Sequence, residues 1–91
     1  MRKEVERLYN EAISLLTELS QDATIPKNVR KKALEARDKL IRGDEALDLR
    51  AVSAVYLLED LVNDPNISAY GRTMIFTIIA KLEALAREAA Q

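Results

Sequence analysis

Apolar residues recur every three or four positions along most of this 91-residue chain, and that spacing narrows its fold more than any other feature. Between residues 3 and 20 the stripe passes through Val5, Leu8, Ala12 and Leu16. A stripe with this period covers one side of an α-helix. The chain also has only two glycines and two prolines, too few for the many turns of a β-sheet protein. The sequence therefore predicts an all-α fold.

Three further segments show the same period, and the breaks between them contain Pro26, Gly43 and Pro65. Proline suits the first turn of a helix, and glycine suits the position just after its last turn. Gly43 is therefore expected to end the second helix in a left-handed conformation, and Asp48 to cap the start of the third. We predict a single domain over residues 1–91, with helices at about 3–20, 26–42, 49–63 and 68–90.

The two halves of the chain share a pattern at an offset of 42 residues (61 − 19, from Leu19 to Leu61). A two-helix unit of this length falls in the range of HEAT-type repeats. The first half resembles such a unit in its order of Asp22, Pro26 and Arg30. Two units are too few for a solenoid, because each unit needs neighbours to bury its faces. We therefore expect two α-hairpins packed into a closed four-helix bundle, with internal duplication as a hypothesis.

Two longer motifs cover the breaks after the first and third segments. Residues 22–30 read Asp-Ala-Thr-Ile-Pro-Lys-Asn-Val-Arg, and residues 63–75 begin Asn-Asp-Pro-Asn-Ile and end Arg-Thr-Met-Ile. Together they resemble the two motifs of a small, uncharacterised archaeal family of helical proteins of about this length. That family usually has proline where this chain has Ser68. The resemblance implies a four-helix fold and an archaeal, cytoplasmic setting, and it implies no activity.

The absence of histidine and cysteine narrows the chemistry available to the chain. It removes the Ser-His and Cys-His nucleophile arrangements, thiolate metal sites and disulfides. Glycine occurs only at positions 43 and 71, so there is no phosphate-binding glycine-rich loop. We therefore expect no catalytic residues, no cofactor and no metal. The N-terminus is charged, and no apolar run approaches the ~20 residues of a membrane span, so we expect a cytoplasmic protein.

The second predicted helix is basic. Residues 26–42 carry seven basic and two acidic side chains. A helix of about 100° per residue places five of the basic ones on its outer face: Lys27, Lys31, Lys32, Lys39 and Arg42. Glu35 and Asp38 lie among them, no aromatic residue is available for base stacking, and the isoelectric point is about 5.5. A solvated face is favoured, and nucleic-acid binding is the alternative.

Three arginines interrupt apolar arcs of the predicted helices: Arg30 and Arg37 in the second, and Arg72 in the fourth. A guanidinium in such a position is costly unless it is paired. We expect these arginines to pair with the acids Asp22 and Asp64 in the breaks, or with backbone carbonyls at helix ends. The alternative is that they hold an anionic group of a ligand.

The third and fourth predicted helices are too apolar all round for ordinary surface helices. Their excess apolar residues include Val52, Tyr56, Met74 and Phe76. Either these helices form the centre of the bundle or part of their surface meets another chain. The sequence therefore favours a non-enzymatic protein–protein interaction module that self-associates as a homo-oligomer, with its process and any other partner unassigned. Weak nucleic-acid or ribonucleoprotein binding through the second helix is the alternative.

Overall fold

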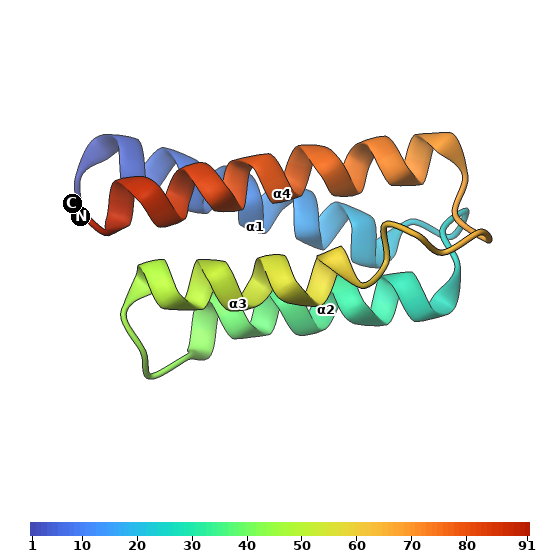
Figure 1. Ribbon diagram of the computed structural model, residues 1–91, viewed down its shortest axis with the longest axis horizontal. Helices are drawn as coiled ribbons and strands as arrows, with labels where there is room; N and C mark the ends of the chain where they lie inside the picture. Colours follow the sequence, from blue (N-terminus) through green and yellow to red (C-terminus); the bar gives the residue numbers. More distant parts are fainter.

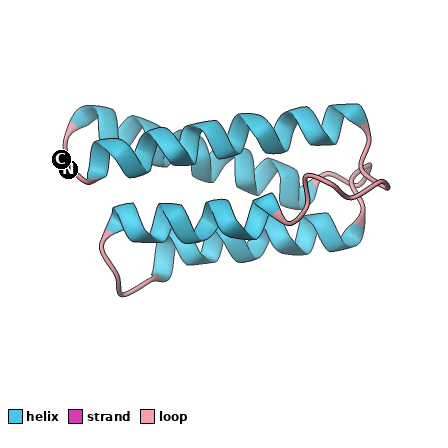
Figure 2. Cartoon of the chain, viewed as in Figure 1, coloured by secondary structure: helices cyan, strands magenta, loops and turns pink.

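A computed structural model describes residues 1–91 of the protein. Its secondary structure consists of four α-helices, and it contains no β-strand (Figures 1 and 2). They are α1 (Lys3–Gln21), α2 (Lys27–Arg42), α3 (Leu47–Glu59) and α4 (Ala69–Ala89). The all-α, four-helix prediction is confirmed. None of the four helices combines the length and apolar character that crossing a membrane would require.

The helices form a square bundle in chain order. Each helix packs against the next and α1 also packs against α4, whereas no Cα atoms of the diagonal pairs α1/α3 and α2/α4 lie within 8 Å of each other. The two connections α1–α2 (residues 22–26) and α3–α4 (residues 60–68) lie at one end of the bundle, and both termini lie at the other (Figure 1). We call these two connections the first and second corner. The bundle measures 37 × 21 × 20 Å.

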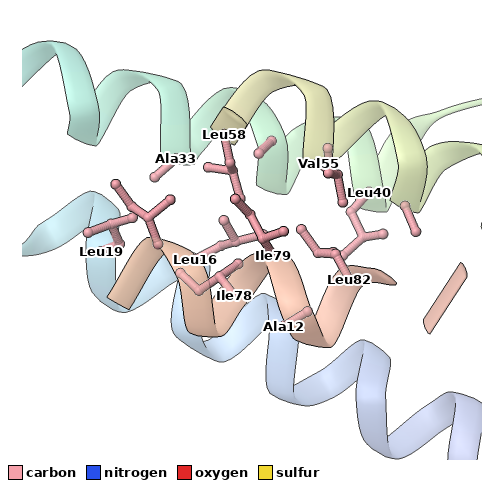
Figure 3. Packing of buried hydrophobic residues seen from close by; sticks show 14 of the residues in the cluster. Ala12, Leu16, Leu19, Ala33, Leu40, Val55, Leu58, Ile78, Ile79 and Leu82 are labelled. Atoms are coloured by element: carbon pink, nitrogen blue, oxygen red, sulfur yellow. The ribbon is translucent and has the colours of Figure 1, made fainter. Parts of the chain in front are cut away.

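A single apolar core runs along the axis, and every helix contributes to it at the three- and four-residue spacing seen in the sequence. Figure 3 shows Leu16, Leu58, Ile78 and Leu82 converging between the helices. Ile25 and Ile67 close the corner end from outside the helices. No charged or polar side chain is buried. Each fully buried Leu or Ile contributes about 1.5–3 kcal/mol, so this core provides the main stabilisation.

The observed bounds differ most from prediction at α3, which spans Leu47–Glu59 rather than 49–63. After Glu59 the chain tightens, because the amide of Leu61 donates to the carbonyl of Leu58 at 3.0 Å and that of Val62 to Glu59 at 3.2 Å. These three-residue turns bring Leu61 onto the core. At the other end, the cap position is Ala46 and Asp48 lies inside the first turn, so the prediction of an Asp48 cap is wrong.

Gly43 follows α2 as predicted, but its φ is −69°. The predicted left-handed conformation is therefore wrong, since any residue adopts this φ. A different constraint acts at Gly43, because a Cβ there would lie 2.6 Å from Cδ of Arg50.

Candidate functional site: an interaction surface

The carboxylate of Asp22 shapes the first corner. Its Oδ1 accepts hydrogen bonds from the Thr24 hydroxyl at 2.6 Å and the Thr24 amide at 2.9 Å. These two bonds, and then the charge of Arg30, hold the pKa of Asp22 below its ordinary value, although partial desolvation opposes them. Asp22 therefore stays ionised and is engaged within its own turn.

Asp64 has the same role in the second corner and also reaches the first. Its Oδ1 accepts from the Asn66 amide at 2.9 Å, and its Oδ2 accepts from Nδ2 of Asn28 at 3.2 Å. The Asn66 amide, then Asn28, and finally the charge of Arg72 lower the pKa of Asp64 against partial desolvation. Because Asn28 lies in the first turn of α2, this bond ties the two corners together.

The two arginines of the 42-residue pattern are half-buried and hydrogen bond to main-chain carbonyls. Arg30 Nε donates to Ile25 O at 3.1 Å. Arg72 Nε donates to Val62 O, and its Nη2 donates to Asp64 O, both at 2.9 Å. Of the two kinds of partner considered from the sequence, the structure uses the carbonyls. Neither arginine forms a salt bridge within 4.0 Å of Asp22 or Asp64, because local amides and a hydroxyl occupy those carboxylates.

The corners also match in their main-chain geometry. Ile25 donates from its amide to Asp22 O at 3.1 Å, and Ile67 donates to Asp64 O at 3.3 Å. Both isoleucines enter the core. The shared turn accounts for the sequence pattern at the corners, and internal duplication stays a hypothesis.

Arg37 differs from the other two arginines. It is half-buried, and its Nε is shielded from solvent without any hydrogen-bond acceptor. The ion pair considered for it from the sequence does not form. Its helical neighbours are Leu34, 44% exposed, and Ile41, 38% exposed. Arg37 therefore lies in an apolar surface with no partner within the chain.

Sequence reasoning missed Arg50, which caps the end of α2 from α3. Its Nη1 donates to Leu40 O at 2.7 Å, and the side chain crosses directly over Gly43. In the same way Arg2 donates to the carbonyl of Glu88 near the end of α4. A signal for Arg50 was present. On the helix its direction falls between those of Leu57 and Ala54, so it interrupts an apolar arc as Arg30 and Arg72 do.

Two of the four predicted interface residues meet on one groove between α3 and α4. Val52, 37% exposed, and Tyr56, 66% exposed, line a shallow groove of about 300 Å³. The groove is completed by Val55, Glu59, Glu83, Ala86 and Arg87.

The other two predicted interface residues lie on different sides of α4. Phe76 is 49% exposed, whereas Met74 packs half-buried against the core. Two positions along a helix differ by about 200° in direction, so Met74 does not share the exposed surface of Phe76.

The basic residues of α2 are partly neutralised. Lys32 lies 3.8 Å from Glu35, and Lys39 lies 3.3 Å from Glu45. Lys27, Lys31 and Arg42 are exposed without an ion pair. The predicted patch of five cations therefore leaves three unpaired ones spread over α2.

Comparison with known proteins gives a consistent assignment. Residues 1–85 match the model of the Uncharacterised protein family (UPF0147). A UPF0147 protein of Thermoplasma volcanium is 51% identical over 90% of this chain and 92% of its own. One from Archaeoglobus fulgidus is 38% identical over 97% of this chain and 100% of its own.

The fold agrees with a crystal structure of a UPF0147 protein from Thermoplasma acidophilum. That structure superposes with a TM-score of 0.88 at 50% identity, covering 92% of this chain and 99% of the other. The sequence match and the shared four-helix fold therefore lead to one conclusion: the chain belongs to the UPF0147 family.

Proposed function

We propose that this protein is a non-enzymatic, cytoplasmic protein-interaction module that associates with a second copy of itself. The observation that carries the proposal is the exposed apolar surface of α3 and α4, where Val52, Tyr56 and Phe76 are 37%, 66% and 49% exposed. Aromatic side chains are enriched at protein–protein interfaces, where they supply much of the binding energy. The groove beside Tyr56 offers a place for a partner's side chains.

The size of the bundle is compatible with such an interface. A long side of the molecule measures 37 Å by about 20 Å. A specific interface buries about 1,000 Å² or more in total, or about 500 Å² from each partner. One face of the bundle therefore provides sufficient area.

Self-association is expected to depend on Tyr56. Light scattering after size exclusion should give a mass above the 10.2 kDa of one chain at high micromolar concentration. Tyr56→Ser should shift the protein towards the monomer, because it removes the largest apolar side chain on the groove. Tyr70→Ser is the matched control, since Tyr70 is also exposed, at 57%, and does not line the groove. A wild-type protein that stays monomeric at high micromolar concentration would refute the proposal.

Binding to duplex DNA or RNA is expected to be undetectable at physiological salt. Two of the five candidate cations are paired with glutamates, and phosphate-driven affinity falls steeply with salt. Fluorescence anisotropy at ~150 mM salt measures this. A sub-micromolar, salt-sensitive affinity that disappears in Lys31→Glu and Lys27→Glu, but not in the control Lys3→Glu at the exposed start of α1, would replace the proposal with nucleic-acid binding.

A further inference from the structure

Charge is divided unevenly between two neighbouring stretches of this nearly neutral chain. Residues 26–42, which contain α2, carry seven basic and two acidic side chains, a net of +5. Residues 43–68, which contain α3, carry one basic and six acidic side chains, a net of −5. Surfaces of opposite charge attract each other and guide association.

The basic stretch contributes to an apolar surface that we call the α1–α2 face. Lys39 lines the groove between α2 and α3, which shows which side of α2 faces α3. The opposite side of α2 faces α1, and the helical spacing places three residues there: Leu34, Arg37 and Ile41. Glu11 pairs with Lys81 of α4 at 3.1 Å, so the opposite side of α1 lies towards α2. Five residues make up the face: Tyr9, Ile13, Leu34, Arg37 and Ile41. Two acids border it by the same helical spacing: Glu6 of α1, and Asp38 of α2, which lies four residues after Leu34 and three before Ile41.

The acidic stretch contributes to the second surface, the α3–α4 face. It consists of the groove beside Tyr56 together with Phe76, which the helical spacing places on the same side of α4 as Glu83. Its apolar residues are Val52, Tyr56 and Phe76, and two glutamates, Glu59 and Glu83, border them with one arginine, Arg87.

The two faces are complementary. On the α1–α2 face, Leu34 and Ile41 flank a guanidinium whose Nε has no acceptor in the chain. On the α3–α4 face, two carboxylates border Val52 and Tyr56 and form no salt bridge. Arg37 is therefore a cation without a partner, and Glu59 and Glu83 are anions without one.

The position of the two faces fixes the kind of assembly. Helices pack in the order α1, α2, α3, α4 around a square, and the Cα atoms of the diagonal pairs stay more than 8 Å apart. The α1–α2 side and the α3–α4 side therefore face in opposite directions (Figure 1). A two-fold dimer cannot bring one copy's α1–α2 face onto its partner's α3–α4 face and also make the reverse contact. Such a contact is head-to-tail, and it propagates to further copies unless a ring closes.

We propose that copies of this chain associate head-to-tail, with the α1–α2 face of one copy on the α3–α4 face of the next, and with Arg37 opposite Glu59 and Glu83. The inference rests on the proposed self-association and specifies its geometry. Each copy keeps one unused face after pairing, so the average mass rises with concentration beyond that of a dimer.

The test uses two variants that each block one face. Leu34→Glu places a carboxylate on the α1–α2 face, and Tyr56→Lys places a cation on the α3–α4 face. Both positions are well exposed, at 44% and 66%, so the fold tolerates the changes, and circular dichroism checks this. Ile41→Glu is a second variant of the α1–α2 face. Ser14→Glu and Thr77→Lys introduce the same charges at exposed positions off both faces.

Each blocked variant alone should be monomeric, and an equimolar mixture should recover a complex of two chains and no more. The mixture contains one intact α1–α2 face, on Tyr56→Lys, and one intact α3–α4 face, on Leu34→Glu. The two controls should assemble as the wild type does. Analytical ultracentrifugation with one variant labelled by a fluorophore measures the recovered complex.

Two outcomes overturn the inference in different ways. If the wild type assembles and Leu34→Glu assembles equally well, self-association stands but the head-to-tail geometry is refuted. Two monomeric variants that fail to combine on mixing refute it as well. A wild-type protein that is monomeric throughout refutes the proposed self-association itself.

Discussion

Replacing Arg72 by alanine is expected to lower the free energy of unfolding by about 2–3 kcal/mol. The wild-type guanidinium donates to Val62 O and to Asp64 O, both at 2.9 Å. Hydrogen bonds from a charged donor contribute about 1.5–3 kcal/mol. The loss leaves the partly buried Val62 O without a donor, and Asp64 O keeps only the Ile67 amide at 3.3 Å. Because these carbonyls belong to the chain just after α3, the second corner loses this side-chain link to α4.

Chemical denaturation of matched variants measures this effect. Lys32→Ala is the surface control, since Lys32 contacts Glu35 at 3.8 Å, and it should change stability by about 0.5 kcal/mol or less. Arg72→Lys should fall between the two, because an ammonium lacks the planar fork that reaches two carbonyls at once. Equal losses in Arg72→Ala and Lys32→Ala would mean that the corner does not depend on this side chain.

The sequence predicts the need for a partner at Arg30 and Arg72 but does not determine which partner is used. Helical spacing alone shows that both arginines interrupt apolar arcs. The choice between carboxylate and carbonyl depends on the corner turns. There Asp22 accepts from Thr24 and Asp64 from Asn66. Side-chain to main-chain bonds of this local kind are characteristic of Asp in turns, and they turn the carboxylates away from the arginines.

The end of α2 shows why other features could not be predicted. Glycine after a helix usually indicates a left-handed residue, yet Gly43 has φ −69°. Its small size is needed because Arg50 passes over it from α3. That contact joins residues that are close in space through the packing of α2 on α3, and no local pattern reveals it.

The candidate interface was predictable in part. Apolar excess on the third and fourth helices indicated Val52, Tyr56, Met74 and Phe76, and three of these are exposed. Met74 packs on the core, because the apolar stripe of α4 is wide enough to include its direction. The α1–α2 face was not predicted. Helical spacing separates Leu34 and Ile41 from the core stripe of α2, with Arg30 and Arg37 between them, but spacing alone does not show that this side of α2 stays exposed beside α1.

Replacing Gly43 by alanine is expected to destabilise the wild type by about 1.5–3 kcal/mol. The new Cβ would lie 2.6 Å from Cδ and 2.8 Å from Cγ of Arg50, closer than carbon atoms approach one another. The side chain of Arg50 must then move, and it loses the 2.7 Å hydrogen bond from Nη1 to Leu40 O. The end of α2 thereby loses the donor that caps it.

The same substitution in an Arg50→Ala background should be neutral or stabilising. The clash with Arg50 no longer exists there, and φ −69° with ψ 151° is a conformation that alanine adopts freely. Alanine also reduces the entropy of the unfolded chain, which stabilises by about 0.4–1 kcal/mol. A contact with Lys39 O at 3.2 Å offsets part of that gain.

A double-mutant cycle of Gly43→Ala and Arg50→Ala, measured by chemical denaturation, gives the coupling between the two positions. We expect a coupling free energy of about 1.5 kcal/mol or more, within the range for residues in direct contact. Arg50→Ala alone should cost about as much as Gly43→Ala alone, because each removes the same bond to Leu40 O. Additive losses would show instead that Gly43 is needed for the local path of the chain between α2 and α3, independently of Arg50.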